Sequence, residues 1–203
     1  MDFNLKRFPD NLVILPGSNK FPNGMGWQKV RKTPKTGWKS ESCTQAILLC
    51  GKVSGVTCID VDDDVAWYDA FCLHHKVPET TCVATPSGGF HYYFKYHKLV
   101  KTTTKFWGRN TADIDIDIRN DRSVACLPGS LYQTKKPEKQ KYVGKLYEFK
   151  VLDDGTVLDF THLKPMPLIF REAKRWGLDK ATFEPMVPVP KFRKFKNVTA
   201  GSS

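Results

Sequence analysis

The stretch GVTCIDVDDDVAWYDAFCLHH, residues 55–75, predicts a strand that runs directly into a helix. Alternate side chains share one face of a strand, so Ile59 and Val61 would pack into a core while Asp60 and Asp62 point to the other side. After the aspartates, the apolar residues recur at helical spacing. The aspartates therefore lie at the junction between an expected strand and the helix that it feeds.

The aspartates of this stretch have two possible roles, and their positions separate them. Asp63 or Asp64 could cap the helix, because a carboxylate there accepts backbone hydrogen bonds and complements the helix dipole. Asp60 comes too early in the chain to be a cap. Two carboxylates on one strand face suit Mg²⁺ or Mn²⁺, which prefer oxygen ligands. We therefore expect Asp60 and Asp62 to ligate metal and a later aspartate to cap the helix.

A second aspartate-rich run, DIDIDIR at residues 113–119, repeats this pattern. Its isoleucines would line one face of a strand. The other face would carry Asp113, Asp115, Asp117 and Arg119. Three carboxylates on one face repel each other unless cations or solvent lie against them. The run is therefore a predicted metal-binding strand, and the turn at Asn120 and Asp121 should lead into the second strand of a hairpin.

The segment PSGGFHYYF, residues 86–94, places a Ser-Gly-Gly turn before a strand. Such a turn is most often only a turn, and a lone histidine is most often structural. Next to metal-bound phosphates the same residues would form a cradle, because glycine admits close approach and backbone N–H groups bind phosphate oxygens. The residues we assign to nucleotide binding are Ser87, Gly88, Gly89, His91 and Arg119.

The charge of the chain favours a polyanionic partner. Its 203 residues include 32 Lys and Arg against 21 Asp and Glu, a formal net charge of +11, and such a field attracts nucleic acid. Residues 60–64 and 113–121 nevertheless hold eight of the 21 acids, which indicates bound cations there. Since no apolar run approaches the roughly 18 residues of a membrane span and no leader is recognised, we expect a soluble, intracellular protein without membrane contact.

The six cysteines include no Cys-x-x-Cys pair, and several lie in strand-like runs, so they are expected to be reduced core thiols. One group is close enough in sequence to be considered for zinc: Cys72, His74, His75 and Cys82. Its spacing fits no common zinc finger, and a helix end followed by a strand explains it better.

Further elements follow from apolar runs and turn signals. Strands are predicted near residues 11–15, on both sides of the glycine-bounded segment 51–55, and over 82–85, 90–96, 123–129 and 142–152. A short helix over 167–177 would end at Gly177 as its cap. Residues 185–203 are proline-rich and then basic, which is typical of a linker or tail.

Three segments, taken together and in this order, resemble a known family. They are AILLCGKVSGVTCIDVDD (46–63), VPETTCVATPSGGFHYYF (77–94) and DIDIRNDRSVACLPGS (115–130). They look like the successive motif blocks of the primase–polymerase domains of the archaeo-eukaryotic primase superfamily. The resemblance covers roughly residues 11–132. It implies an α+β fold, with an RRM-like antiparallel catalytic lobe packed with a smaller α/β lobe, and a catalytic domain over residues 1–184.

The resemblance also implies an activity and assigns residues to it. Asp60 and Asp62 would form the first motif, Ser87 and His91 the second, and Asp117 the third, with Asp115 as an alternative ligand. Two Mg²⁺ or Mn²⁺ ions would support nucleotidyl transfer from an NTP or dNTP to a 3′-hydroxyl on a single-stranded or primed DNA template. The family context implies a virus, phage or plasmid replication protein in the host cytoplasm or at a viral replication site, with a replicative helicase domain following the tail.

Basic residues of the long connection before the first aspartate run are assigned to the template backbone: Lys29, Arg31, Lys32 and Lys35, with Lys20 and the lysines of 135–145 in support.

Two other functions remain open. The first is a single-strand-binding module that uses charge and aromatic stacking, with aromatic residues at Trp27, Trp38, Phe106, Trp107, Phe192 and Phe195. Clustered aspartates would repel its ligand unless metal intervened. The second is a metal-dependent nuclease, which also uses carboxylates and two ions but has no need of a triphosphate cradle.

Overall fold

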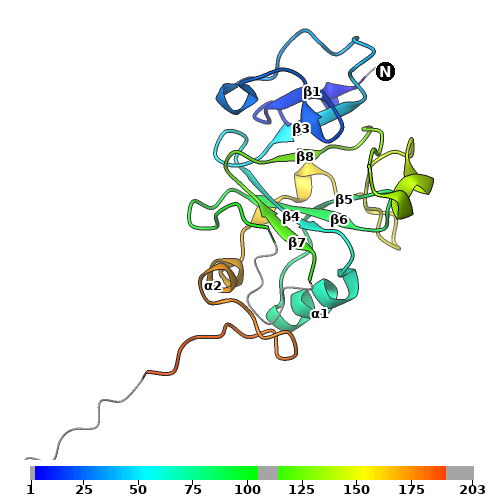
Figure 1. The fold of residues 1–203 in the computed structure, drawn as a ribbon. Helices are drawn as coiled ribbons and strands as arrows, with labels where there is room; N and C mark the ends of the chain where they lie inside the picture. Colours follow the sequence, from blue (N-terminus) through cyan, green and yellow to red (C-terminus); the bar gives the residue numbers. More distant parts are fainter. Residues whose placement is uncertain (1–2, 105–113, 191–203) are drawn as a thin grey trace, which may run out of the picture.

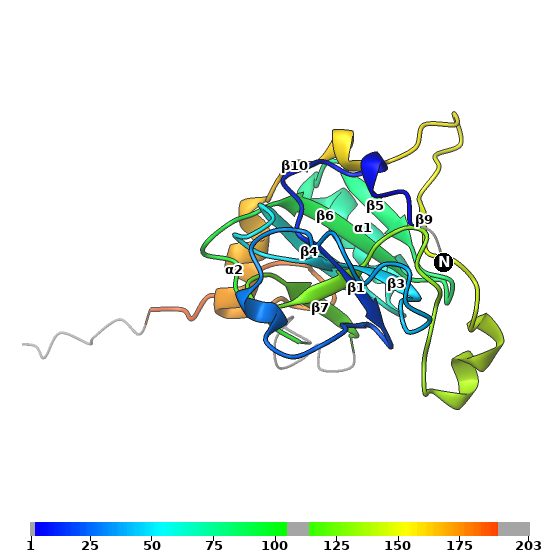
Figure 2. The ribbon, with the colours of Figure 1, turned by 90° about the horizontal axis from the view of Figure 1, so that it is seen from above.

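The computed structural model describes residues 3–104 and 114–190. These residues form an α+β fold in which two mostly antiparallel sheets and two α-helices lie in three layers (Figures 1 and 2). In Figure 1 the four-stranded sheet lies at the top, the six-stranded sheet in the middle and both α-helices below it. The α+β class expected from the sequence is confirmed, and the RRM-like arrangement of the catalytic lobe stays a prediction.

The six-stranded sheet contains the strands that carry the predicted motifs. Its order is β7-β4-β6-β5-β9, with β10 paired to β6 in parallel. Its strands are β4 (Val56–Val61), β5 (Thr81–Ala84), β6 (Phe90–Lys95), β7 (Ile116–Arg119), β9 (Glu148–Phe149) and β10 (Lys164–Pro165). The three motif strands β7, β4 and β6 are therefore immediate neighbours.

One face of this sheet is covered by α1 (Val65–His75) and α2 (Leu168–Trp176). The core beneath the helices contains Ile59, Val61, Ile116, Ile118, Tyr68, Phe71 and Phe170. The alternation predicted for both aspartate runs is confirmed, because their apolar members all point to this core. Burial of each such side chain contributes about 1.5–3 kcal/mol. The register of β4 and β7 is thereby fixed, since a slip by one residue would turn the aspartates into the core.

The opposite face of the large sheet meets the four-stranded sheet. The order of that sheet is β2 (Phe21–Pro22), β1 (Ile14–Ser18), β3 (Gln45–Leu49) and β8 (Val124–Cys126). A second core between the sheets contains Ile47 and Leu48 of β3 together with Cys58 of β4 and Tyr93 of β6. The described ranges also contain the 3-10 helices η1 (Leu5–Arg7), before β1, and η2 (Trp27–Lys29), η4 (Pro137–Tyr142) and η5 (Phe160–His162), in connections.

The hairpin predicted about the turn at Asn120 is wrong. β7 pairs with β4 while β8 pairs with β3, so the chain passes from the large sheet to the small sheet at this turn. Asn120 is fully buried, its amide donates to the carbonyl oxygens of His97 and Val100, and its side-chain oxygen accepts from the Thr57 hydroxyl. A turn fixed to two other segments, the loop at 97–100 and β4, directs the chain away from β7, and sequence signals for tight turns do not reveal such partners.

Both predicted helices are confirmed, and Gly177 is the C-terminal cap of α2. Asp64 occupies the N-cap position of α1, as expected, but its side chain makes no capping hydrogen bond. Its Oδ2 instead accepts a 2.7 Å hydrogen bond from the backbone N–H of Asp115. The carboxylate therefore connects the start of the helix to the segment that enters β7.

Several predictions concern residues beyond the described part of the chain. Asp113, Phe106, Trp107, Phe192 and Phe195, together with most of the expected tail, lie in 105–113 and 191–203, outside the described residues. The boundary at residues 184 and 185 stays a prediction. All six cysteines are free thiols and five are buried, which confirms their role in the core. Neither α-helix in the described ranges is long and apolar enough to cross a membrane.

Candidate active site

Three of the predicted site residues lie in one row across three adjacent strands. Asp60 of β4 is paired directly with His91 of β6 on one side and with Asp117 of β7 on the other. Residues directly opposite in an antiparallel pair have Cβ atoms about 4.5–5.5 Å apart. All three side chains lie on the face of the sheet away from the helices, because their chain neighbours fill the helix-covered core.

Arg119 neutralises the centre of this row. Its Nε donates to Asp60 Oδ2 at 2.7 Å, its Nη2 lies 2.6 Å from the same oxygen, and Nη2 lies 3.5 Å from Asp117 Oδ2. Burial alone would raise the pKa of Asp60, but His91 and Arg119 outweigh it and hold this pKa well below its usual range. Asp60 is therefore ionised at neutral pH although it is only 7% exposed.

His91 is 6% exposed, yet it belongs to the charged face and not to the apolar interior. Its Nε2 lies 3.4 Å from Asp60 Oδ1, and its Nδ1 lies 3.4 Å from the Tyr93 hydroxyl. The centre of its ring lies 5.7 Å from that of Tyr147. These contacts fix the orientation of the imidazole before any ligand binds.

The pKa of Asp62, the residue that follows β4, is shifted in the opposite direction from that of Asp60. Burial and then the charge of Asp60 raise its pKa, and the nearby Lys139 and Lys20 only partly offset them. Lys139 of η4 is itself engaged with Asp63, at 3.1 Å between Nζ and Oδ1. This end of β4 therefore concentrates more negative charge than its neighbours neutralise, which is typical of a cation site.

A pocket of about 180 Å³ opens beside this row, between the two sheets. The large sheet and its β5–β6 turn supply Asp60, Asp62, Thr85, His91 and Arg119. The small sheet and its connections supply Lys20, Phe21, Val124, Ala125, Cys126, Tyr132 and Tyr147. Lys20 Nζ lies 5.2 Å from the centre of the Tyr132 ring. The pocket thus combines carboxylates, cations and aromatic faces, while Asp117 stands next to it through its contact with Arg119.

The Ser-Gly-Gly turn joins β5 to β6, and the structure explains its glycines by packing. A Cβ on Gly89 would overlap the carbonyl oxygen of Val61 and would lie 2.8 Å from that of Asp62. Gly88 has a φ of +95°, a conformation that favours glycine. Gly89 N–H donates to the Thr85 hydroxyl and Gly88 N–H to the Thr85 carbonyl. Two N–H groups assigned to phosphate are therefore used within the turn, and phosphate binding by this turn stays a prediction.

The donors of the row fit a hard divalent cation. They are carboxylate oxygens, and the buried Asp60 Oδ1 has only the 3.4 Å ion-pair contact with His91 Nε2, without a well-formed hydrogen bond among the described residues. A buried acceptor in that state costs free energy that a bound cation would recover. The three aspartates do not form a compact three-ligand group here, because Arg119 stands between Asp60 and Asp117.

The residues considered for zinc are divided in the structure. His74 Nε2 lies 2.7 Å from Glu184 Oε1, and His75 Nε2 lies 2.6 Å from the Phe183 carbonyl oxygen. Cys82 is buried in β5. The ligating atoms of His74, His75 and Glu184 all lie within 4.8 Å of one another, so glutamate and not cysteine accompanies the two histidines.

The basic residues assigned to DNA lie on the connection between β2 and β3. Lys29, Arg31, Lys32 and Lys35 are all exposed, and none of them lines the pocket. Arg31 donates to the carbonyl oxygens of Gln28 and Val30. Contact of these four residues with DNA stays a prediction.

Sequence reasoning missed Thr85, Tyr132 and Tyr147 as pocket residues. Thr85 had a usable signal, because Ser and Thr hydroxyls close to glycines organise turns. The two tyrosines had none. Tyr147 reaches the pocket because its backbone pairs with Gly129 and Ser130, a contact between segments that no local pattern predicts.

Comparison with protein families gives one match. The family model described as bifunctional DNA primase/polymerase, N-terminal (Prim-Pol), matches residues 8–149. This range is well over half of the chain, and it includes every residue assigned above to metal, nucleotide or DNA. No curated protein matches the chain.

Proposed function

The chain belongs to the bifunctional DNA primase/polymerase family, and on this premise we propose that it carries out template-directed nucleotidyl transfer in DNA replication. The substrate would be an NTP or a dNTP, and the acceptor the 3′-hydroxyl of a growing strand or initiating nucleotide. The catalytic domain would extend over residues 1–184.

One observation carries the proposal: the row Asp117, Asp60 and His91 across β7, β4 and β6, next to a pocket with cationic and aromatic walls. A triphosphate is anionic and its base is aromatic, so Lys20, Arg119 and the pocket tyrosines complement its two ends. Asp62 at the mouth of the row adds the carboxylate that a second cation would need. A plain binding surface for DNA would have no use for buried carboxylates.

Asp60, Asp62 and Asp117 would hold two Mg²⁺ or Mn²⁺ ions, which would supply Lewis acidity to the attacking hydroxyl and to the leaving pyrophosphate. His91 would donate to the triphosphate from the orientation set by Tyr93 and Asp60. Ser87 would add a hydroxyl donor at the β5–β6 turn, while the N–H groups of Gly88 and Gly89 would reach phosphate only by releasing Thr85.

Arg119 can bind either the carboxylates of the row or the triphosphate of a bound nucleotide. In the structure it binds Asp60 and Asp117. A triphosphate in the pocket offers it oxygens of equal or greater charge. We infer that Arg119 moves from the carboxylates to the triphosphate when the site is loaded, so that cation and nucleotide binding reinforce each other.

The template would lie along Lys29, Arg31, Lys32 and Lys35, with Lys139 near the site. Each phosphate contact that is lost should reduce the slope of log affinity against log salt by about 1. Residues 185–203, which are proline-rich and then basic, would connect the catalytic domain to a replicative helicase domain, as in a virus, phage or plasmid replication protein.

The test is incubation with a primed template, labelled dNTPs or NTPs, and Mn²⁺ or Mg²⁺. The proposal expects extension of the primer, and removal of the ions with EDTA should stop it. Degradation of the primer would indicate a nuclease. Retention of the DNA without any change in its length would indicate a binding module. Synthesis on a single-stranded circle without a primer would further identify priming.

A further inference from the structure

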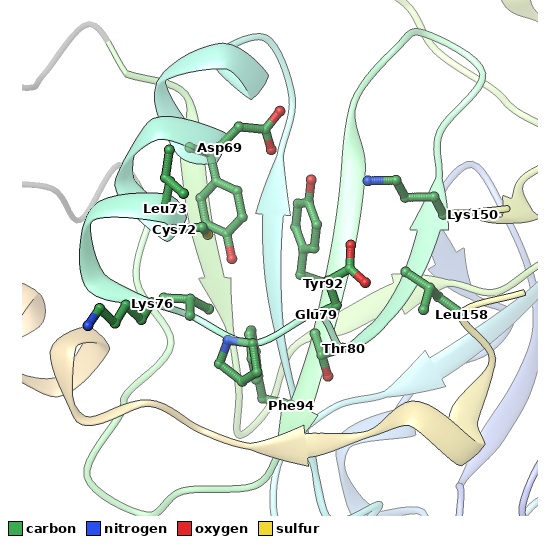
Figure 3. Close-up of a pocket in the computed structure, with 13 residues that line it drawn as sticks. Asp69, Cys72, Leu73, Lys76, Glu79, Thr80, Tyr92, Phe94, Lys150 and Leu158 are labelled. Carbon is green, nitrogen blue, oxygen red and sulfur yellow. The ribbon is translucent and has the colours of Figure 1, made fainter. Parts of the chain in front are cut away.

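A second and larger pocket, of about 420 Å³, lies on the helix-covered side of the large sheet (Figure 3). It lies between α1 with the segment that follows it and the β6 residues Tyr92 and Phe94, with Lys150 and Leu158 on its far side. Its walls include Leu73, Val77, Pro78, Phe94 and Leu158, together with the side chains of Tyr68 and Tyr92. Tyr92 is the chain neighbour of His91 on β6, so this pocket and the candidate active site lie on opposite faces of one strand.

Two phenol hydroxyls in this pocket lack polar partners. The hydroxyl oxygens of Tyr68 and Tyr92 are buried, and neither has an oxygen or nitrogen partner within the described residues. The Cys72 thiol next to Tyr68 is only a weak hydrogen-bonding group. Each unsatisfied buried hydroxyl costs about 1–3 kcal/mol. The pocket therefore contains hydrogen-bonding capacity that the protein itself does not use.

The rim of the pocket carries both signs of charge. Figure 3 shows Asp69 on α1, Lys150 on the opposite side and Tyr92 between them. Lys76 and Glu79 complete the charged rim. The rim thus carries two cations and two carboxylates, so it offers hydrogen-bond donors and acceptors without net charge.

We propose that this pocket binds a nucleobase. A nucleobase is flat and uncharged, and its edge presents both donors and acceptors. The half-buried ring of Tyr92 provides a surface for one of its faces, and the buried Tyr68 ring supports Tyr92 with ring centres 4.6 Å apart. The two phenols, Lys150 and Asp69 provide partners for its edge. The base can come from a free nucleoside or from an unpaired position of a strand, since the recognised chemistry is the same.

Other ligand classes fit less well. A purely apolar molecule would fill the walls but leave both hydroxyls unsatisfied. An anion such as a free triphosphate would meet Asp69 and Glu79 at the rim as well as the two lysines. A macromolecular anion is similarly disfavoured at this rim unless it inserts a base.

The experiment measures binding of 2′-deoxyadenosine and of thymidine by calorimetry and by saturation-transfer NMR. We expect Tyr92→Phe to weaken binding about fivefold, because one hydrogen bond is lost while the ring is kept. The matched control is Tyr96→Phe, since the Tyr96 hydroxyl donates to Asp121 and lies outside the pocket. The Tyr92→Phe protein should melt no lower than wild type without ligand, because its hydroxyl has no partner to lose.

The inference does not require polymerase activity, and the same titration on a Tyr132→Ala protein separates the two sites, because Tyr132 lines only the first pocket. Nucleoside binding that is unchanged in Tyr132→Ala and weakened in Tyr92→Phe places the ligand in the second pocket, whereas loss in Tyr132→Ala alone places it in the first and overturns the proposal. An oligothymidylate of ten residues distinguishes the sources: weakened binding in Tyr92→Phe indicates a base from a strand, and unchanged binding indicates a free nucleoside. Absence of nucleoside binding at millimolar concentration, or equal weakening by Tyr92→Phe and Tyr96→Phe, overturns the proposal.

Discussion

Ile59 and Asp60 are adjacent in β4, yet they belong to opposite faces of the large sheet. Ile59 is fully buried in the core under the two helices. Asp60 lies on the face toward the small sheet, where it contacts Arg119 and His91 and lines the first pocket. The same alternation holds on β6, where His91 lines the candidate active site and Tyr92 lines the second pocket.

Alternate side chains of a strand lie on opposite faces, so the two faces of one strand can have different roles. The helix face contributes stability by burying apolar surface, and it fixes the register. The charged face is then positioned at no further cost in backbone entropy, because the same backbone is already ordered. Substitutions of adjacent residues should therefore separate stability from catalysis.

The largest effect is expected from Asp60→Asn. If Asp60 holds a cation that stabilises several kcal/mol of transition-state charge, primer extension should fall about a thousandfold or more. Affinity for primed DNA should stay within about threefold, because Asp60 lies in the pocket and not among the exposed lysines. Single-turnover extension and fluorescence anisotropy measure the two quantities. Normal extension by a folded Asp60→Asn protein would remove Asp60 from the site.

The next largest effect is expected on the opposite face, from Ile59→Ala. Removal of a fully buried isoleucine should cost about 2–5 kcal/mol of unfolding free energy. Extension per folded molecule should remain close to wild type, because the side chain does not reach the pocket. Chemical denaturation and active-site titration provide the two readings. A strong loss of turnover in the folded fraction would show that the two faces are not independent.

The sequence predicted the division into faces because alternation is a local property. The two aspartate runs predicted that Ile59 and Ile118 lie on the buried apolar face. They also predicted that Asp60 and Asp117 lie on the opposite face. The row itself required pairing of β4 with β6 and with β7. Motif order, supported by family resemblance, was enough to group these residues, although it did not give the register.

What could not be predicted depends on contacts between distant segments. The turn after β7 was expected to close a hairpin, and the buried amide of Asn120 instead fixes it to other loops. Gly89 was assigned to phosphate, while the structure shows it packed on the backbone of β4. Tyr132 and Tyr147 gave no signal at all. In each case the decisive partner lies far away in the chain.

A third experiment examines the guanidinium at the centre of the charged face. Arg119→Ala should strengthen Mn²⁺ binding about tenfold in the absence of nucleotide, because the cation no longer competes with Arg119 for Asp60 and Asp117. It should also weaken nucleotide binding. Calorimetry with Mn²⁺ alone checks the first effect, and Arg175→Ala on the exposed side of α2 is the matched control. Unchanged or weaker Mn²⁺ binding would mean that Arg119 does not compete with the ion.

The smallest expected change is the effect of Asp62→Asn on stability, and its sign is the informative part. Burial and the neighbouring Asp60 raise the pKa of Asp62. The ionised carboxylate therefore lowers the free energy of unfolding at neutral pH. Asp62→Asn should therefore raise the unfolding free energy at pH 7, within about 1 kcal/mol, while extension is lost. The gain should shrink as the pH falls through the raised pKa, because wild-type Asp62 then becomes neutral as well.

The pKa shift of Asp60 has the opposite sign. Its lowered pKa contributes stability above about pH 4 that is lost in acid. Melting curves of both Asn variants from pH 3 to pH 8 would record the two slopes, and a stability loss for Asp62→Asn at pH 7 would show that Asp62 is paired with cations in the same way as Asp60.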